Sequence, residues 1–155
     1  MRLAWSLCLL PREAALAAGV IREVSMSHRS KSLGNLGEGL VADFLAAHGY
    51  RLVDTNVRPI GGASRGELDI IAWDDPYLVF VEVKSRRSSV IEPVIPILAI
   101  DHRKRCQLIR LAEAYLANLQ LDDVPIRFDV AEVLYSQSLP PVVTLHRGVF
   151  DASDT

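Results

Sequence analysis

The stretch from Gly66 to Lys84 constrains the fold more strongly than any other part of the chain. Apolar residues recur at every second position from Leu68 to Ala72, which is the period of a β-strand with one apolar face. Asp74-Asp75-Pro76 then has the composition of a turn, and Tyr77 to Val83 is almost continuously apolar. Such a run is typical of a central strand that is covered on both faces. The stretch therefore predicts a hairpin in the interior of a sheet.

Three charged residues interrupt these apolar strands, namely Asp69, Glu82 and Lys84. Glu82 and Lys84 are two positions apart, so their side chains project from the same face of the sheet. Antiparallel pairing across the turn brings Asp69 beside them. Charges are rarely buried in such strands unless they form ion pairs or hold a metal. This group is therefore the first candidate for a functional site.

The two carboxylates favour a hard divalent cation. An oxygen-rich pair without cysteine or clustered histidine suits Mg²⁺ or Mn²⁺ rather than zinc. We expect Asp69 and Glu82 to bind the cation and the backbone carbonyl of Val83 to add a third oxygen. Lys84 would orient or deprotonate a water and offset charge on a phosphate. The alternative is an ordinary exposed sheet face that carries a Glu–Lys pair, which is common on protein surfaces.

A first helix is predicted from Leu33 to His48, with Gly49 as its left-handed C-terminal cap. Its apolar positions recur at intervals of three and four residues and are expected to form one core face: Leu33, Leu36, Leu40, Val41, Phe44 and Leu45. Glu38 lies at the edge of this face, where it is either solvated or, if the helix packs over the hairpin, a further carboxylate of the site. Glycines around it, Gly37 among them, indicate close approach of another backbone or a ligand.

The remaining elements complete an α/β fold. We expect a strand at Tyr50 to Asn56, an irregular stretch at Lys84 to Pro96, a helix capped by Asp101 and reaching Leu119, a strand at Ile126 to Leu134, and an edge strand at Pro141 to His146. The second helix is long enough for a right-handed crossover to a parallel strand. The order predicts a mixed central sheet of four to five strands, an αβββαβ core, flanked by helices.

Length and composition indicate one globular domain. The chain has 155 residues, 50% hydrophobic, and a formal net charge of −2, so it is not a protein that coats nucleic acid indiscriminately. We expect the domain at 28–150, a tail at 151–155, and an extension at 1–27 that is either disordered or, with translation starting at Met26, upstream of the true start. A short helix packed on the domain is the alternative. Two cysteines and no membrane-length apolar run predict a cytoplasmic protein without a membrane partner.

Basic residues near the hairpin and at the start of the second helix are candidates for phosphate contacts. They are Arg58, Arg65, Arg86, Arg87, Arg103, Lys104 and Arg105. Cations in the first turn of a helix oppose its dipole, and an anionic partner would offset this cost. The alternative is that these residues are solvated surface charges.

The motif Asp69, twelve residues, then Glu82-Val83-Lys84 matches the signature of PD-(D/E)xK nucleases, with Leu68 in place of the proline. The wider pattern resembles the YraN family, a bacterial group of predicted endonucleases distantly related to archaeal Holliday junction resolvases. The resemblance is carried by Gly37-Glu38, Asn56-x-Arg58, Gly66-Glu67-Leu68-Asp69-Ile70-Ile71, Val79-Phe80-Val81-Glu82-Val83-Lys84-x-Arg86, Lys104 and Arg127-Phe128-Asp129.

This resemblance implies a restriction-endonuclease-like fold with Glu38, Asp69, Glu82 and Lys84 as the catalytic set. Our leading hypothesis is a Mg²⁺- or Mn²⁺-dependent endonuclease that acts on DNA, with structured or branched DNA as the expected partner, although the resemblance itself does not name a substrate. Because junction cutters need two opposed active sites, it also implies a homodimer. Two alternatives stay open, a non-catalytic nucleic-acid-binding or adaptor protein with the same fold and a nuclease that acts on RNA.

Overall fold

The computed structural model describes residues 33–60, 65–87, 100–137 and 139–153. The extension expected at 1–27 lies outside these residues, as do most of the stretch expected to be irregular between Lys84 and Pro96 and the middle of the loop before the hairpin. No helix in the described ranges is long and apolar enough to span a membrane.

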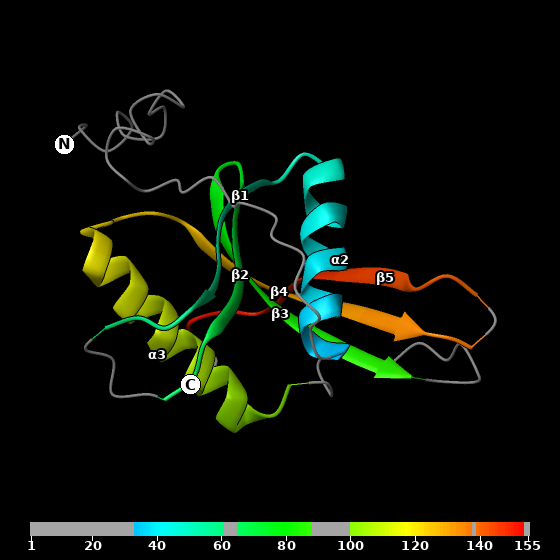
Figure 1. The fold of residues 1–155 in the computed structure, drawn as a ribbon. Helices are drawn as coiled ribbons and strands as arrows, with labels where there is room; N and C mark the ends of the chain where they lie inside the picture. The colour runs from blue at the N-terminus through cyan, green and yellow to red at the C-terminus, as the bar shows by residue number, and fades with distance from the viewer. Residues whose placement is uncertain (1–32, 61–64, 88–99, 138, 154–155) are drawn as a thin grey trace.

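The strands form one mixed sheet in the order β1-β2-β3-β4-β5 (Figure 1). Their bounds are β1 Arg51–Val57, β2 Leu68–Asp74, β3 Tyr77–Arg87, β4 Ile126–Tyr135 and β5 Val142–Phe150. The first three strands form an antiparallel meander, β4 lies parallel to β3, and β5 pairs antiparallel with β4 as an edge strand. Helix α2, Leu33–Ala47, precedes the sheet, and helix α3, His102–Leu119, lies between β3 and β4. The predicted αβββαβ core and restriction-endonuclease-like fold are confirmed.

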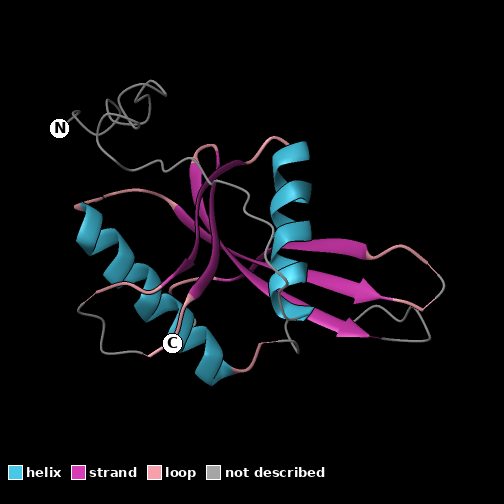
Figure 2. Cartoon of the chain, in the orientation of Figure 1, coloured by secondary structure: helices cyan, strands magenta, loops and turns pink. Residues whose placement is uncertain are grey.

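The two helices cover opposite faces of the sheet (Figure 2). Side chains of β3 alternate between these faces, so that Leu78 and Phe80 pack in the cluster that contains α3, while Val79 and Val81 pack in the cluster that contains α2. All four side chains are buried. Cover on both faces is the reason for the continuous apolar run in this strand, as predicted from the sequence.

α2 rests on the sheet through small and apolar side chains. Gly37, Val41 and Leu45 are buried, and a Cβ atom at Gly37 would overlap the Oγ of Ser85 in β3. The absence of a side chain therefore lets this helix approach β3 closely, as expected for a glycine at this position. The N-terminal half of α2, which carries Glu38, is thus held beside the end of β3.

The predicted apolar face of α2 was too wide. Leu36 and Leu40 were expected in the core, but they are 52% and 36% exposed. The prediction was wrong for these two residues because the helix contacts the sheet along the line of Gly37 and Val41, which turns both leucines to its flank.

The sheet opens between β2 and β3. Their pairing ends at Ile70 and Val81, whereas β3 continues in parallel register with β4 as far as Arg87. Beyond Ile70, β2 pairs with β1 through Leu68 and Val57. Leu68 packs in the α3 cluster, although the two-residue period placed it on the same face as Ile70, which packs in the α2 cluster. The local change of face accompanies the separation of the two strands.

β3 is also longer than predicted. Lys84 to Arg87 were expected to be irregular, but they continue the strand. The physical reason is the register with β4, in which Lys84 pairs with Glu132 and Arg87 pairs with Tyr135. This long-range pairing keeps the polar end of β3 extended and places its side chains on defined faces.

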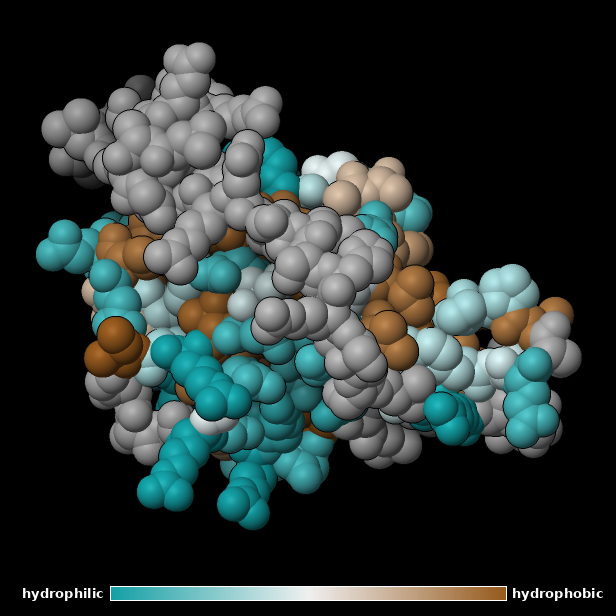
Figure 3. Space-filling view, viewed as in Figure 1, coloured by the Kyte–Doolittle hydropathy of each residue, from teal (hydrophilic) through white to brown (hydrophobic). Residues whose placement is uncertain are grey.

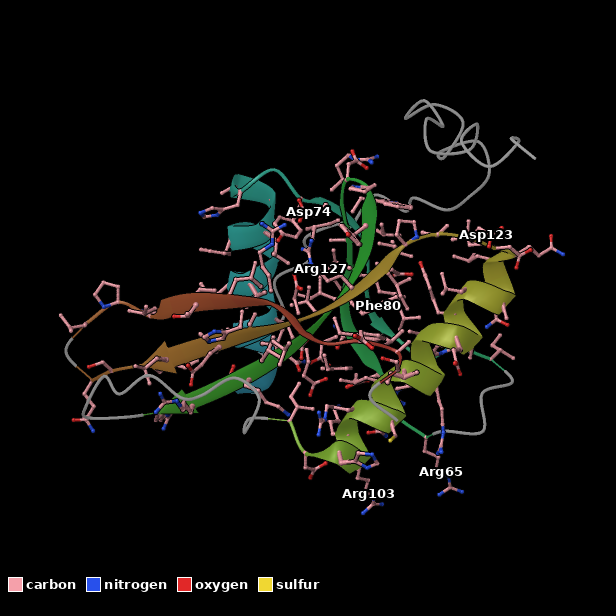
Figure 4. All side chains as sticks on the ribbon, turned by 180° about the vertical axis from the view of Figure 1, so that it is seen from behind. Arg65, Asp74, Phe80, Arg103, Asp123 and Arg127 are labelled. Atoms are coloured by element: carbon pink, nitrogen blue, oxygen red, sulfur yellow. The ribbon has the colours of Figure 1, made fainter. Side chains whose placement is uncertain are left out.

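A buried ionic network stabilises the end of the sheet that lies opposite the opening between β2 and β3 (Figure 4). Arg127 donates to both carboxylate oxygens of Asp129 at 2.8 and 2.9 Å and lies 2.8 Å from the carboxylate of Asp74. It also donates to the hydroxyl of Tyr50 at 3.1 Å, and Asp129 accepts from the backbone N–H of Gly148. The hydrogen bonds to Asp129 raise the pKa of the Arg127 guanidinium above its ordinary value. The network joins β2, β4 and β5.

Replacing Arg127 with methionine should destabilise the protein by about 3–5 kcal/mol, because it leaves the fully buried carboxylate of Asp129 without its cation. Urea unfolding measures this loss. Arg51→Gln is the control, since Arg51 pairs with Asp75 on the surface, where both side chains are largely exposed, and it should cost less than about 1 kcal/mol. Equal losses in both variants would show that the network contributes no more than a surface ion pair.

Candidate active site

Glu82 is 5% exposed and has a lysine at each carboxylate oxygen. The Nζ of Lys84 lies 2.9 Å from Oε1, and the Nζ of Lys104 lies 3.0 Å from Oε2. Lys84 projects from the same face of β3 as Glu82, as predicted, and Lys104 reaches Glu82 from α3, which covers that face. A buried carboxylate without a cation would be strongly destabilising. The two ion pairs therefore explain how this charge is accommodated.

Asp69 lies at the opening of the sheet, next to the last paired residue of β2. Its Oδ2 accepts a hydrogen bond from the backbone N–H of Val83 at 2.8 Å. The carboxylate thereby takes the place of a strand carbonyl at the point where β2 leaves β3, and a backbone donor is satisfied. The structure thus brings Asp69 to the segment of Glu82, Val83 and Lys84, as the hairpin predicted.

Burial and a like charge raise the pKa of Asp69 from 3.8 to about 6. Burial has the largest effect, and the nearby charge of Glu82 adds to it. The hydrogen bond from Val83 and the charge of Lys104 act in the opposite direction but are smaller. Two carboxylates that repel each other in a partly apolar setting form an arrangement that a divalent cation would relieve.

Glu38 is placed beside this pair and not within it. The described residues contain no group of three carboxylate, histidine or cysteine side chains close enough to hold one metal ion. The charge of Glu38 still reaches Asp69 and contributes weakly to its raised pKa. The oxygen donors that the structure brings to the opening of the sheet are therefore the carboxylates of Asp69 and Glu82, and the carbonyl of Val83 stays a predicted third ligand. Such an all-oxygen set fits Mg²⁺ or Mn²⁺.

The first two turns of α3 are fixed against the start of β2. Asp101 caps the helix as predicted, since its carboxylate accepts from the backbone N–H of Lys104 at 2.8 Å. One turn later, the side-chain amide of Gln107 donates to the carbonyl of Arg65. Gly66 permits this contact, because it has φ +150° and its Cβ atom would lie only 2.7 Å from the Nε2 of Gln107. These contacts hold the helix that carries Lys104 beside the strand that carries the aspartate.

Four of the basic residues predicted to bind nucleic acid point outward. Arg65 and Arg103 project away from the N-terminal half of α3 (Figure 4), where Figure 3 shows hydrophilic side chains extending from the surface. Arg87 is exposed at the end of β3. Arg58 is exposed as well and pairs with Glu67 at 3.0 Å. These four residues are accessible on the surface, and phosphate contacts by them stay a prediction.

The other three basic residues point inward or along the sheet. Lys104 pairs with Glu82, and Arg86 forms a hydrogen-bonded ion pair with Glu132 of the neighbouring strand. Arg105 is partly buried on α3. Phosphate contacts by these residues stay a prediction, and for Lys104 and Arg86 such contacts would compete with an acidic partner inside the protein.

Sequence reasoning missed Gln107 and Glu132 as residues that shape the site. Glu132 lies opposite Lys84 in the register of β3 and β4, a neighbour that is visible only once the parallel pairing is known. Gln107 contacts a backbone carbonyl 42 positions earlier in the chain, and no local pattern indicates such a contact.

Asp69→Asn should stabilise the metal-free protein at pH 8. The folded-state pKa of Asp69, about 6, lies above its ordinary value of 3.8, so the folded protein binds this proton more tightly than the unfolded chain does. Wild-type stability should therefore fall as the pH rises from about 4 to about 6. Asparagine has no charge and still offers an oxygen to the N–H of Val83. We expect a gain on the order of 1–3 kcal/mol at pH 8 and almost none at pH 4, measured by urea unfolding with a chelator present. A loss of stability at both pH values would contradict the raised pKa of Asp69.

Comparison with known proteins identifies the family. The sequence profile described as "Uncharacterised protein family UPF0102" matches residues 37–133, a range that includes Glu38, Asp69, Glu82 and Lys84. A UPF0102 protein of Alkaliphilus metalliredigens is 44% identical over 105 residues, which are 68% of this chain and 87% of the relative. A UPF0102 protein of Symbiobacterium thermophilum is 45% identical over 104 residues, 67% of this chain and 83% of the relative. A UPF0102 protein of Geobacter metallireducens is 38% identical over 117 residues, which are 76% of this chain and 91% of the relative. The chain therefore belongs to the UPF0102 family, which is the YraN family that its motifs indicated.

Proposed function

We propose that this protein is a Mg²⁺-dependent endonuclease that hydrolyses phosphodiester bonds in DNA and that branched or otherwise structured DNA is its substrate. The observation that carries the proposal is the meeting of Asp69 with the segment of Glu82 and Lys84 at the opening of the sheet. The match of these residues to the PD-(D/E)xK signature supports the same function.

Each residue of the site has a separate task in this proposal. Asp69 and Glu82 hold a Mg²⁺ or Mn²⁺ ion, with the carbonyl of Val83 as a third ligand. When bound, the cation supplies Lewis acidity toward the phosphate and lowers the pKa of water. The ammonium of Lys84 would offset the negative charge that grows on the phosphate as the oxygen of water bonds to phosphorus and the P–O bond to the leaving oxygen breaks. The proton of the attacking water passes to solvent, and the leaving oxygen takes up a proton from solvent. Glu38, at the outer part of the site, orients the attacking water.

Binding to DNA relies on the phosphate backbone in this proposal. The outward arginines Arg58, Arg65, Arg87 and Arg103 are exposed on a chain whose net charge is −2, and in this proposal they contact the phosphates. Aromatic residues are 6% of the chain, which disfavours recognition by base stacking. We further propose that the protein acts in the cytoplasm and as a homodimer, because cutting a junction on two strands requires two opposed sites.

The direct test is a cleavage assay on linear, nicked, flapped and four-way DNA with Mg²⁺ or Mn²⁺. Wild type should give metal-dependent product, and paired cuts on opposite strands of the four-way substrate would report the homodimer. Glu82→Gln should lower cleavage by at least about 100-fold, because it removes a charged ligand and the partner of Lys84. DNA affinity should be largely unchanged, since it comes from the surrounding basic residues.

Arg51→Gln is the matched control for this assay, because Arg51 pairs with Asp75 in the exposed turn at the opposite end of the hairpin. It should cleave as wild type does. The same trace activity in wild type and Glu82→Gln, at equal DNA occupancy, would identify the activity as contamination. The protein would then be a non-catalytic nucleic-acid-binding protein with this fold.

A second test concerns the outward arginines. DNA affinity should fall steeply with salt concentration, because cations on the protein release the counterions of the phosphates that they neutralise. Replacing Arg65 and Arg103 with glutamine should reduce the slope of log K against log [salt] by about one unit for each phosphate that is no longer neutralised. Fluorescence anisotropy at several salt concentrations measures this slope, with Arg51→Gln as the control. Identical slopes in the double variant and the control would show that these arginines are ordinary surface charges that do not contact phosphates.

A further inference from the structure

Lys104 occupies a helical position that is unfavourable for a lysine. It lies three residues after the N-cap Asp101, in the first turn of α3, where the helix dipole disfavours a cation and glutamate is the favoured residue. Its neighbour Arg103 is exposed, but the ammonium of Lys104 turns inward to Glu82. Contact with a buried carboxylate is the interaction that compensates for this placement.

Glu82 is thereby covered from two elements. Lys84, on the same strand, takes Oε1, and Lys104, on α3, takes Oε2. Both oxygens of a proposed metal ligand therefore face ammonium groups. A divalent cation that reaches Glu82 meets strong repulsion from a cation already at hydrogen-bond distance, so one ammonium has to move away.

We propose that Lys104 is an internal counter-ion that competes with the divalent cation for Glu82 and, once displaced, turns to a phosphate of the bound DNA. This inference rests on the proposed function and deepens it, because it makes the loading of the site depend on DNA. Lys104 acts as a positioning residue, since it keeps Glu82 oriented and neutralised before the cation binds.

The position of α3 explains why Lys104, and not Lys84, is the lysine that leaves. Lys104 lies on the helix whose N-terminal half carries the outward Arg103 and contacts the carbonyl of Arg65. A phosphate held by these arginines is close to the helix turn that carries Lys104. DNA and the divalent cation should therefore each strengthen the binding of the other, because DNA accepts Lys104 and frees Glu82.

Calorimetric titration with Mn²⁺ in the absence of DNA tests this proposal. Lys104→Gln should bind Mn²⁺ about tenfold more tightly than wild type, because a competing charge at the ligand is gone. Lys104→Arg should bind as wild type does, since it restores the charge. Arg110→Gln is the matched control on the same helix, since Arg110 is an exposed cation, and it should change the affinity by less than about twofold because exposed charges are screened.

Unchanged or weaker Mn²⁺ binding by Lys104→Gln, with clear binding by wild type, would overturn the role of Lys104 and leave the proposed metal site intact. Absence of Mn²⁺ binding in wild type and in all three variants would overturn both the role of Lys104 and the proposed metal site. If Lys104→Gln fails to fold, the rate of acetylation of Lys104 in the wild-type protein tests whether the lysine is displaced. Mass spectrometry measures this rate, and saturating Mg²⁺ should raise it several-fold. An unchanged rate would show that Lys104 is not displaced.

Discussion

The pairing of one buried carboxylate with two lysines is the interaction on which the rest of this site depends. Glu82 lies on the central strand β3 and is 5% exposed. The residues that precede it in this strand pack on both faces of the sheet. Its charge is tolerated because Lys84 and Lys104 approach from two different elements. The pairing with Lys104 links the strand that carries Glu82 to helix α3.

The opening of the sheet is the second constraint. β2 is separated from β3 before Ile70, so the backbone of β3 beyond Val81 needs a new acceptor, and the carboxylate of Asp69 supplies it to Val83. The same separation places Asp69 near Glu82 without a strand hydrogen bond between them. At the opposite end, the Arg127 network holds β2, β4 and β5 together. The sheet is therefore fixed firmly at one end and opened for polar side chains at the other.

Much of this arrangement could be predicted from the sequence because it follows from local patterns. The continuous apolar run of β3, the turn after Asp74 and the cap at Asp101 each have a local cause, and the structure confirms them. Other features depend on distant contacts and could not be predicted. The exposure of Leu36 follows from the way α2 lies on the sheet, the extension of β3 to Arg87 follows from pairing with β4, and the inward direction of Lys104 follows from the packing of α3.

The central claim is that Asp69 and Glu82 form a divalent cation site in a nuclease. Anomalous diffraction from crystals grown with Mn²⁺ tests this claim most directly, because it locates the ion independently of any activity. We expect a Mn²⁺ peak in contact with both carboxylates, with at least one lysine withdrawn from Glu82. Diffraction at saturating Mn²⁺ that shows no peak between these carboxylates, and shows Glu82 still paired with both lysines, would contradict it.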